Sequence, residues 1–307
     1  MKAEFIGETS NDLTAVNAAR VSMSKLSKEF TCRKDKPKGS DEGLLQYLAK
    51  ESHWTPYSHQ RVTLVGCLHW LDIQELDSRD IAGMVWSDGG DKVRTSLWGW
   101  ANLIWKGRVH SDYTRSLHHT LHRLWPESTK ALLGESPTHV IKSVNQPTDP
   151  VETDPEFMDV TLRETVPLLV ARQRFKHFVG FTYNEVSRRY VQGDIEIDMP
   201  DTWRLKPEGS VKQGSGGDHP YQSAINAQVE KHHLACIEMY DSLIKQGVCA
   251  EQARGVLPRW MLTSYYVTGS RAAWKRAYDL RIDNHSQKEI QSLAQQWAEL
   301  MPWLKEV

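Results

Sequence analysis

The chain has 307 residues, enough for one large domain or two small ones with a substantial hydrophobic core. Its 38 basic and 39 acidic residues nearly cancel, which argues against a nucleic-acid coat or a polybasic membrane anchor. The four cysteines are scattered and none forms a CxxC pair, so we expect neither a metal site nor a disulfide framework.

The amino-terminal residues "MKAEFIGETSND" lack the apolar run of a signal peptide. No stretch approaches the roughly 18 apolar residues of a membrane span. These patterns predict a soluble, cytoplasmic protein.

Apolar spacing predicts two helices near the start of the chain. Residues 12–26 repeat apolar side chains at helical intervals, and a second helix begins in 43–53, with Ser40 or Asp41 as its N-cap. Pro56 ends this helix in the turn "WTPYSH".

A strand is predicted over 60–70, and residues 70–150, rich in Trp and His, are expected to be mostly helical. Residues 145–156 hold three prolines and four acidic residues, which predicts a loop and the best internal boundary.

In the second half, 157–175 reads as a strand that enters a buried helix or strand. A long amphipathic helix is predicted over 221–247, with Gly247 as its C-cap, and further helices over 251–269 and 270–301. Few strands among long helices favour an α+β fold.

The segment "FTYNEVSRRY", 181–190, gathers a carboxylate, hydroxyls, an amide and two arginines behind the basic "VARQRFKH". A hydrophobic core cannot use so many polar groups, because each buried one needs a partner. This mixture indicates a planar, anionic, hydrogen-bonding ligand such as a nucleotide.

Residues 172–190 resemble the signature of the flavin-dependent thymidylate synthases, an Arg-His-Arg followed by Ser-x-Asn-Glu-x-Ser-x-Arg-Tyr. Thr182 stands for the first Ser, and the residues that follow match it: Asn184, Glu185, Ser187, Arg189 and Tyr190.

Four further blocks resemble this family in the expected order: "AARVS" at 18–22, "HWTPYSH" at 53–59, "EQARGVLP" at 251–258 and "LRIDNHSQKEI" at 280–290. The resemblance implies one domain over 1–307 with a twisted, mostly antiparallel sheet and long flanking helices. It leaves about 66–156 as an insertion that is atypical of the family.

The resemblance implies reductive methylation of dUMP to dTMP. Methylenetetrahydrofolate supplies the carbon, and FAD reduced by NADPH supplies the hydride, in a homotetramer with active sites at subunit interfaces. No cysteine lies in the matched blocks, which agrees with a route that needs no cysteine nucleophile.

By resemblance, the dUMP-binding residues are Gln173, Glu185, Ser187, Arg189, Arg254 and Arg281. Arginine suits the phosphate dianion because its planar fork can pair two oxygens. Structural or surface ion pairs are the alternative for Arg189 and Arg254.

The catalytic residues expected by resemblance are Arg281 and Ser187. A guanidinium at Arg281 would stabilise negative charge on the uracil carbonyls; the alternative is a cation at a helix C-terminus. If helical, the segment brings His285 and Gln287 near Arg281. No His or Lys lies near Ser187 to activate it as a nucleophile, and a capping hydroxyl is its alternative.

By resemblance, the FAD-binding residues are His53, Thr55, Ser58, Lys176, His177, Asn184, Glu185, Ser270, Arg276 and His285. No GxGxxG follows a strand, so a Rossmann cradle is not expected.

The chain departs from the signature at its Arg-His-Arg. With a one-residue insertion, Lys176 and His177 fit the first two positions and Phe178 replaces the last arginine. Ser58 stands where many members have Glu, and Ser270 where Asn is common.

Two rival functions stay open. A pyrimidine nucleotide hydroxymethylase on the same scaffold would keep the nucleotide residues and relax those for flavin. A nucleic-acid-binding protein would use "RQRFKH" and "SRRY" as a basic, aromatic patch, although the neutral overall charge and Glu185 argue against it.

Overall fold

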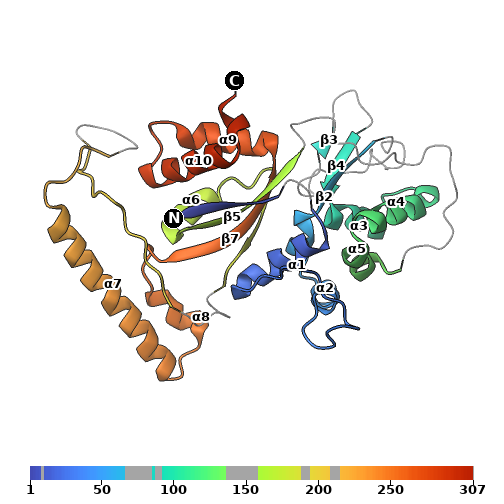
Figure 1. Cartoon of the computed structure of the whole chain (residues 1–307), viewed down its shortest axis with the longest axis horizontal. Coiled ribbons are helices and arrows are strands. Elements are labelled where there is room, and N and C mark those ends of the chain that lie inside the picture. The colour runs from blue at the N-terminus through green and yellow to red at the C-terminus, as the bar shows by residue number, and fades with distance from the viewer. Residues whose placement is uncertain are drawn as a thin grey trace.

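The computed structural model describes residues 1–7, 10–65, 85–86, 92–135, 158–187, 194–207 and 215–306 (Figure 1). The predicted boundary loop at 145–156 and Arg189 with Tyr190 lie outside these ranges, as does part of the predicted insertion. The single-domain prediction therefore stays a prediction.

A four-stranded antiparallel sheet joins the amino-terminal strand to three strands from the second half of the chain. Its order is β1 (Lys2–Gly7), β5 (Asp159–Pro167), β7 (Leu262–Ser270) and β6 (Phe181–Glu185). Together with the helices around it, this sheet confirms the predicted α+β class.

Three helices accompany this sheet: α6 (Leu168–Arg174), α9 (Arg271–Ile282) and α10 (Lys288–Leu300). Figure 1 shows α9 and α10 side by side above the sheet, and the two helices pack against each other. They cover one face of the sheet.

The apolar face of α10 helps to fill the core beneath these helices. Its buried Ile290, Leu293 and Trp297 recur at helical spacing. They share one hydrophobic core with Leu162 of β5 and Val267 of β7.

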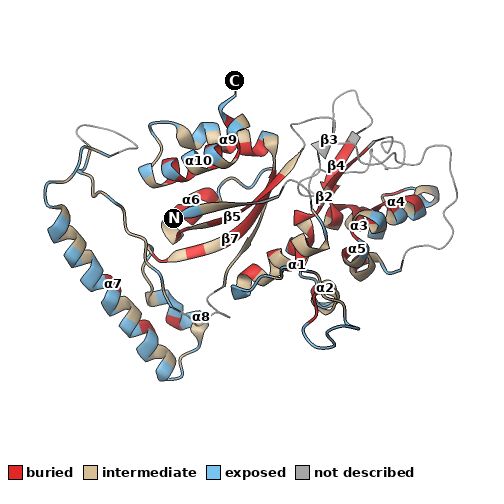
Figure 2. Ribbon diagram, viewed as in Figure 1, coloured by how far each residue is buried: buried red, intermediate tan, exposed pale blue. Residues whose placement is uncertain are grey.

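The first half of the chain builds a second core around its own smaller sheet. The sheet has the order β2 (Arg61–Val65), β4 (Lys92–Ser96) and β3 (Val85–Trp86). The elements around it are α1 (Asp12–Arg20), α2 (Asp41–Lys50), η2 (Thr55–His59), α3 (Leu97–Trp105), α4 (Ser111–Leu124) and α5 (Pro126–Leu133). Buried residues such as Leu45, Tyr57 and Trp100 fill this core. Figure 2 shows buried residues in red on α1 and on the strands of this sheet.

Buried polar contacts join the two halves. The His59 ring at the end of η2 contacts Thr268 Oγ1 on β7 at 2.7 Å and Asn184 Oδ1 on β6 at 3.1 Å. Asp159 on β5 pairs with Arg94 of β4 and lies 3.8 Å from Arg61 Nη1 of β2.

The long helix α7 (Gln222–Lys245) stands apart from the sheet in Figure 1. It packs against α8 (Ala250–Ala253) and η6 (Arg254–Val256), and only His233 and Tyr240 of its residues are buried. Gly247 follows its C-cap with φ of 85°, a conformation that favours glycine.

Several predicted elements are confirmed, and one is wrong. Ser40 caps α2 by accepting from Gly43 N–H, and 157–175 contains a strand followed by a helix. Residues 262–270 form a central strand instead of a helix, because buried neighbours on both faces suit their β-branched and aromatic side chains. The described residues of 70–150 are mostly helical as expected, with short strands at 85–86 and 92–96.

No helix in the described part of the chain is long and apolar enough to cross a membrane.

Candidate active site

A cavity of about 520 Å³ opens where α6 meets the turn between α9 and α10. It brings together three of the predicted site residues, Gln173, Arg281 and His285. The rest of its lining comes from Arg204, Ser215, Asn284, Ser286, Gln287 and Lys288. Amides, hydroxyls and cations predominate, which suits an anionic, hydrogen-bonding ligand.

Arg281 lies in the last turn of α9, and its Nε donates to His177 Nε2 at 2.7 Å. Burial lowers the pKa of His177 to about 4, and the positive charges of Arg281, Arg174 and Arg276 add to the effect. The imidazole is therefore neutral at pH 7 and can accept this hydrogen bond.

The proximity of Arg281, His285 and Gln287 has a different cause from the predicted one. Helix α9 ends at Ile282. The turn that follows contains His285 and leads to Gln287, the N-cap of α10. Gln287 Oε1 accepts from Gln173 Nε2 at the cavity wall. The exposed His285 contacts Asp283 Oδ1 at 2.9 Å.

Among the described residues, the other predicted nucleotide residues, Glu185, Ser187 and Arg254, form a second group near the end of β6. Thr263 Oγ1 donates to Glu185 Oε1 at 2.7 Å. Burial raises the pKa of Glu185, although this hydrogen bond and the positive charge of Arg254 each act to lower it. Ser187 N–H donates to the Ser22 carbonyl at 3.0 Å, so the "AARVS" and central blocks meet.

Within one chain, these two groups stay separate. Among the described residues, Glu185, Ser187 and Arg254 do not line the 520 Å³ cavity. Arg254 is exposed, and its Nε contacts the Glu251 carbonyl at 3.4 Å.

The "HWTPYSH" block lies against β6. This packing brings some of the predicted flavin residues near one another. The Ser58 carbonyl accepts from Thr182 Oγ1 at 3.3 Å, and Asn184 contacts His59. His53 and Thr55 are exposed on the same turn.

The loop between α6 and β6 holds the flavin candidates Lys176 and His177, and Arg276 contacts it from α9. Lys176 is exposed, Phe178 is 72% exposed, and Arg276 Nη2 donates to the Val179 carbonyl. An exposed aromatic face beside cations fits a planar ring that carries a pyrophosphate.

Glycine lets this loop lie close to α9. At Gly180, φ is 80°, and an added Cβ would lie 2.8 Å from Ala273 Cβ. A larger residue would therefore both strain the backbone and push the loop away from the helix.

Ser270 has a local structural partner: its hydroxyl caps α9 by accepting from Ala273 N–H at 3.3 Å.

Sequence reasoning missed Thr263 and Arg204. Arg204 Nη2 donates to Glu289 Oε1 at 2.7 Å, and no pattern around it signalled a site.

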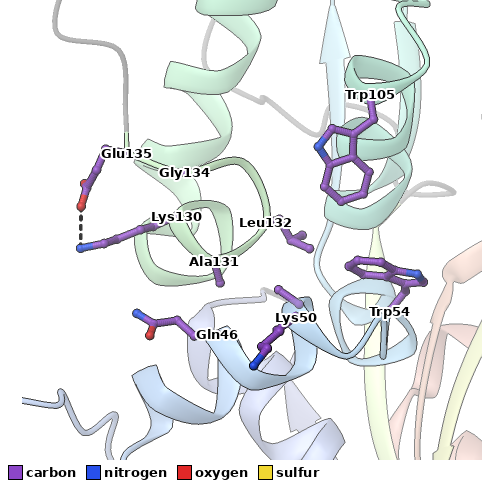
Figure 3. A pocket seen from close by; sticks show the side chains of 10 residues that line it. Gln46, Lys50, Trp54, Trp105, Lys130, Ala131, Leu132, Gly134 and Glu135 are labelled. Carbon is purple, nitrogen blue, oxygen red and sulfur yellow. Dashed lines mark ion pairs between the residues drawn. The ribbon is translucent and has the colours of Figure 1, made fainter.

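A second cavity of about 450 Å³ lies in the first half of the chain, between α2, α5 and Trp105 of α3 (Figure 3). Trp54 stacks on Trp98 with ring centroids 4.3 Å apart, and Lys130 pairs with Glu135 at 2.8 Å. Its described lining includes none of the predicted site residues, so the cavity at Arg281 is the better candidate.

The model of the family described as thymidylate synthase complementing protein matches residues 143–303, and the chain belongs to this family. The resemblance inferred from the sequence blocks is therefore confirmed.

Curated relatives named flavin-dependent thymidylate synthase include the following two. That of Aquifex aeolicus (strain VF5) is 34% identical over 153 residues, which are 49% of this chain and 47% of the relative. That of Thermosipho africanus (strain TCF52B) is 32% identical over 157 residues, 50% of this chain and 68% of the relative. The chain thus spans about half to two thirds of the relatives' lengths.

Among solved structures, a UMP/dUMP methylase PolB from Streptomyces cacaoi, bound with 5-Br dUMP, has a TM-score of 0.45 and 20% sequence identity. The alignment covers 99% of this chain and 92% of that chain.

Proposed function

We propose that this chain is a flavin-dependent thymidylate synthase that methylates dUMP to dTMP. Methylenetetrahydrofolate would supply the carbon, and NADPH would reduce the FAD. Family membership supports this proposal, and the observation that carries it is the cavity at which Gln173 and Arg281 meet.

Arg281 is proposed as the catalytic cation. Before uracil C5 can attack an electrophilic carbon, electron density must build up on the ring and its carbonyls, and a positioned guanidinium stabilises that negative charge. The Gln173 and Gln287 amides offer donors and acceptors for the edge of the base.

The phosphate and sugar are assigned to the second group. Arg189 and Arg254 would pair with the phosphate dianion, while Glu185 and Ser187 would bind the nucleotide by hydrogen bonds. Ser187 has no role as a nucleophile in this proposal.

FAD, when bound, would supply the hydride. Lys176 and Arg276 would neutralise its pyrophosphate, and the exposed face of Phe178 would contact a planar ring. The remaining candidates offer polar contacts: His53, Thr55, Ser58, His177, Asn184, Glu185, Ser270 and His285.

A homotetramer would unite the two groups, since a second copy can place its Glu185 group against this chain's Arg281. The exposed apolar residues of α7 support such an assembly: Leu234 is 62% exposed and Met239 is 53% exposed. We propose a cytoplasmic enzyme without a nucleic-acid or membrane partner.

The test combines the absorption spectrum of the purified protein with calorimetric titration of dUMP. We expect a flavin spectrum and dUMP binding that weakens in Arg281→Ala but not in Lys275→Ala, which removes an exposed cation from the same helix. A colourless protein that cannot be loaded with FAD and does not bind dUMP would contradict the proposal.

A further inference from the structure

A buried chain of hydrogen bonds lies behind the contact between His177 and Arg281. Arg174 ends α6, and its side chain is fully buried, as is that of Glu164 on β5. Arg174 Nε donates to the two carboxylate oxygens of Glu164 at 3.2 and 3.3 Å. The charge of Arg174 is therefore paired inside the core.

Aromatic rings fix the orientation of the Arg174 guanidinium. Its central carbon lies 4.4 Å from the centroid of Phe181 and 4.8 Å from those of Trp274 and Trp297. Such stacking suits the planar guanidinium better than a lysine ammonium. Its Nη1 donates to Tyr183 Oη at 2.6 Å.

Tyr183 connects this arginine to the loop after α6. Its hydroxyl donates to the His177 carbonyl at 2.6 Å, and His177 N–H donates to the Arg174 carbonyl at 3.0 Å. The imidazole of the same His177 accepts from Arg281 Nε. A continuous path thus runs from the core to the cavity wall.

Stability alone gives a weak reason for this arrangement. Replacing a buried ion pair with apolar side chains of similar volume is often neutral or stabilising. In this pair, however, Arg174 is held so that its Nη1 donates to the Tyr183 hydroxyl. An apolar pair could not supply this donor.

We propose that Arg174 and Tyr183 are positioning residues that hold His177 so that its imidazole orients Arg281 at the cavity. The importance of that orientation for catalysis rests on the proposed function. A guanidinium that is already oriented needs no reorganisation when charge develops on the substrate.

The test is Tyr183→Phe, which removes the hydroxyl and keeps the ring. NMR would follow the titration of His177, identified by the signal lost in His177→Gln. Without the anchor on its carbonyl, His177 moves away from burial and from Arg281, so its pKa rises from about 4 by roughly one unit or more. We also expect kcat to fall by up to about 10²-fold.

Tyr57→Phe is the matched control, because Tyr57 is fully buried in the other core and its hydroxyl donates to the Leu45 carbonyl at 2.6 Å. It should leave the His177 titration unchanged. A folded Tyr183→Phe protein with the wild-type His177 titration would overturn the inference. The titration needs no substrate, so a wild-type protein inactive on dUMP would count against the proposed function alone.

Discussion

The two cores of the chain differ in what their polar residues do. In the second, the buried Glu164 and Arg174 connect to a cavity whose lining residues all follow residue 172. In the first, polar residues cap helices or hold loops, as Ser40 and Asp41 do around α2. The comparison teaches that the proposed catalytic cation belongs to the second core, while the first contributes the flavin candidates of the η2 turn and supports the β6 edge through His59.

The largest effect on stability is expected from a substitution at the junction of the two cores. Asp159→Ala leaves Arg61 and Arg94, each with a side chain 8% exposed, without their carboxylate. We expect a loss of about 3–5 kcal/mol in the free energy of unfolding, measured with urea. Asp279→Ala, which breaks an exposed pair with Lys275, should cost at most about 1 kcal/mol. Equal losses would show that the junction has no special role.

A change at the cavity beside the second core should affect catalysis more than stability. Arg281→Ala should lower kcat about 10²–10³-fold because it removes a charge that stabilises the transition state. Lys275→Ala on the same helix should retain the wild-type rate. Steady-state kinetics with dUMP check this, and full turnover by Arg281→Ala would remove it from the catalytic residues.

The pH dependence of stability should report on His59. Burial lowers its pKa from 6.5 to about 3, so the unfolded chain takes up the proton first as the pH falls. Stability should decrease from about pH 6.5 downward, by up to about 1.4 kcal/mol per pH unit for one proton. His59→Gln should flatten this slope in urea unfolding. An unchanged slope would mean that His59 does not contribute.

The smallest effect is expected within the first core. Ser40→Ala removes the hydroxyl that accepts from Gly43 N–H at 3.1 Å, which should cost about 1 kcal/mol. Calorimetric dUMP affinity should be unchanged. A weaker affinity would break the functional separation of the two cores.

Much of the fold could be predicted because local signals agree with the tertiary structure. The apolar spacing of 12–26 leads to α1, which ends earlier, at Arg20, and the hydroxyl of Ser40 caps α2 as expected. The strand at 262–270 was missed because burial on both faces hides the alternation that marks a half-buried strand.

The site was predictable only where residues lie close in sequence or in a known pattern. The sequence blocks identified Gln173 and Arg281. They could not predict that a turn brings Gln287 near Arg281, because this depends on where α9 ends. Thr263 beside Glu185 depends on the pairing of β6 with β7, which no local pattern encodes.

The most direct test of the central claim is mass analysis of the nucleotide after anaerobic incubation of the FAD-loaded protein with dUMP, methylenetetrahydrofolate and NADPH. The proposed chemistry predicts thymidylate, formed only when all three are present. Unchanged dUMP, or a hydroxymethylated product, would contradict it.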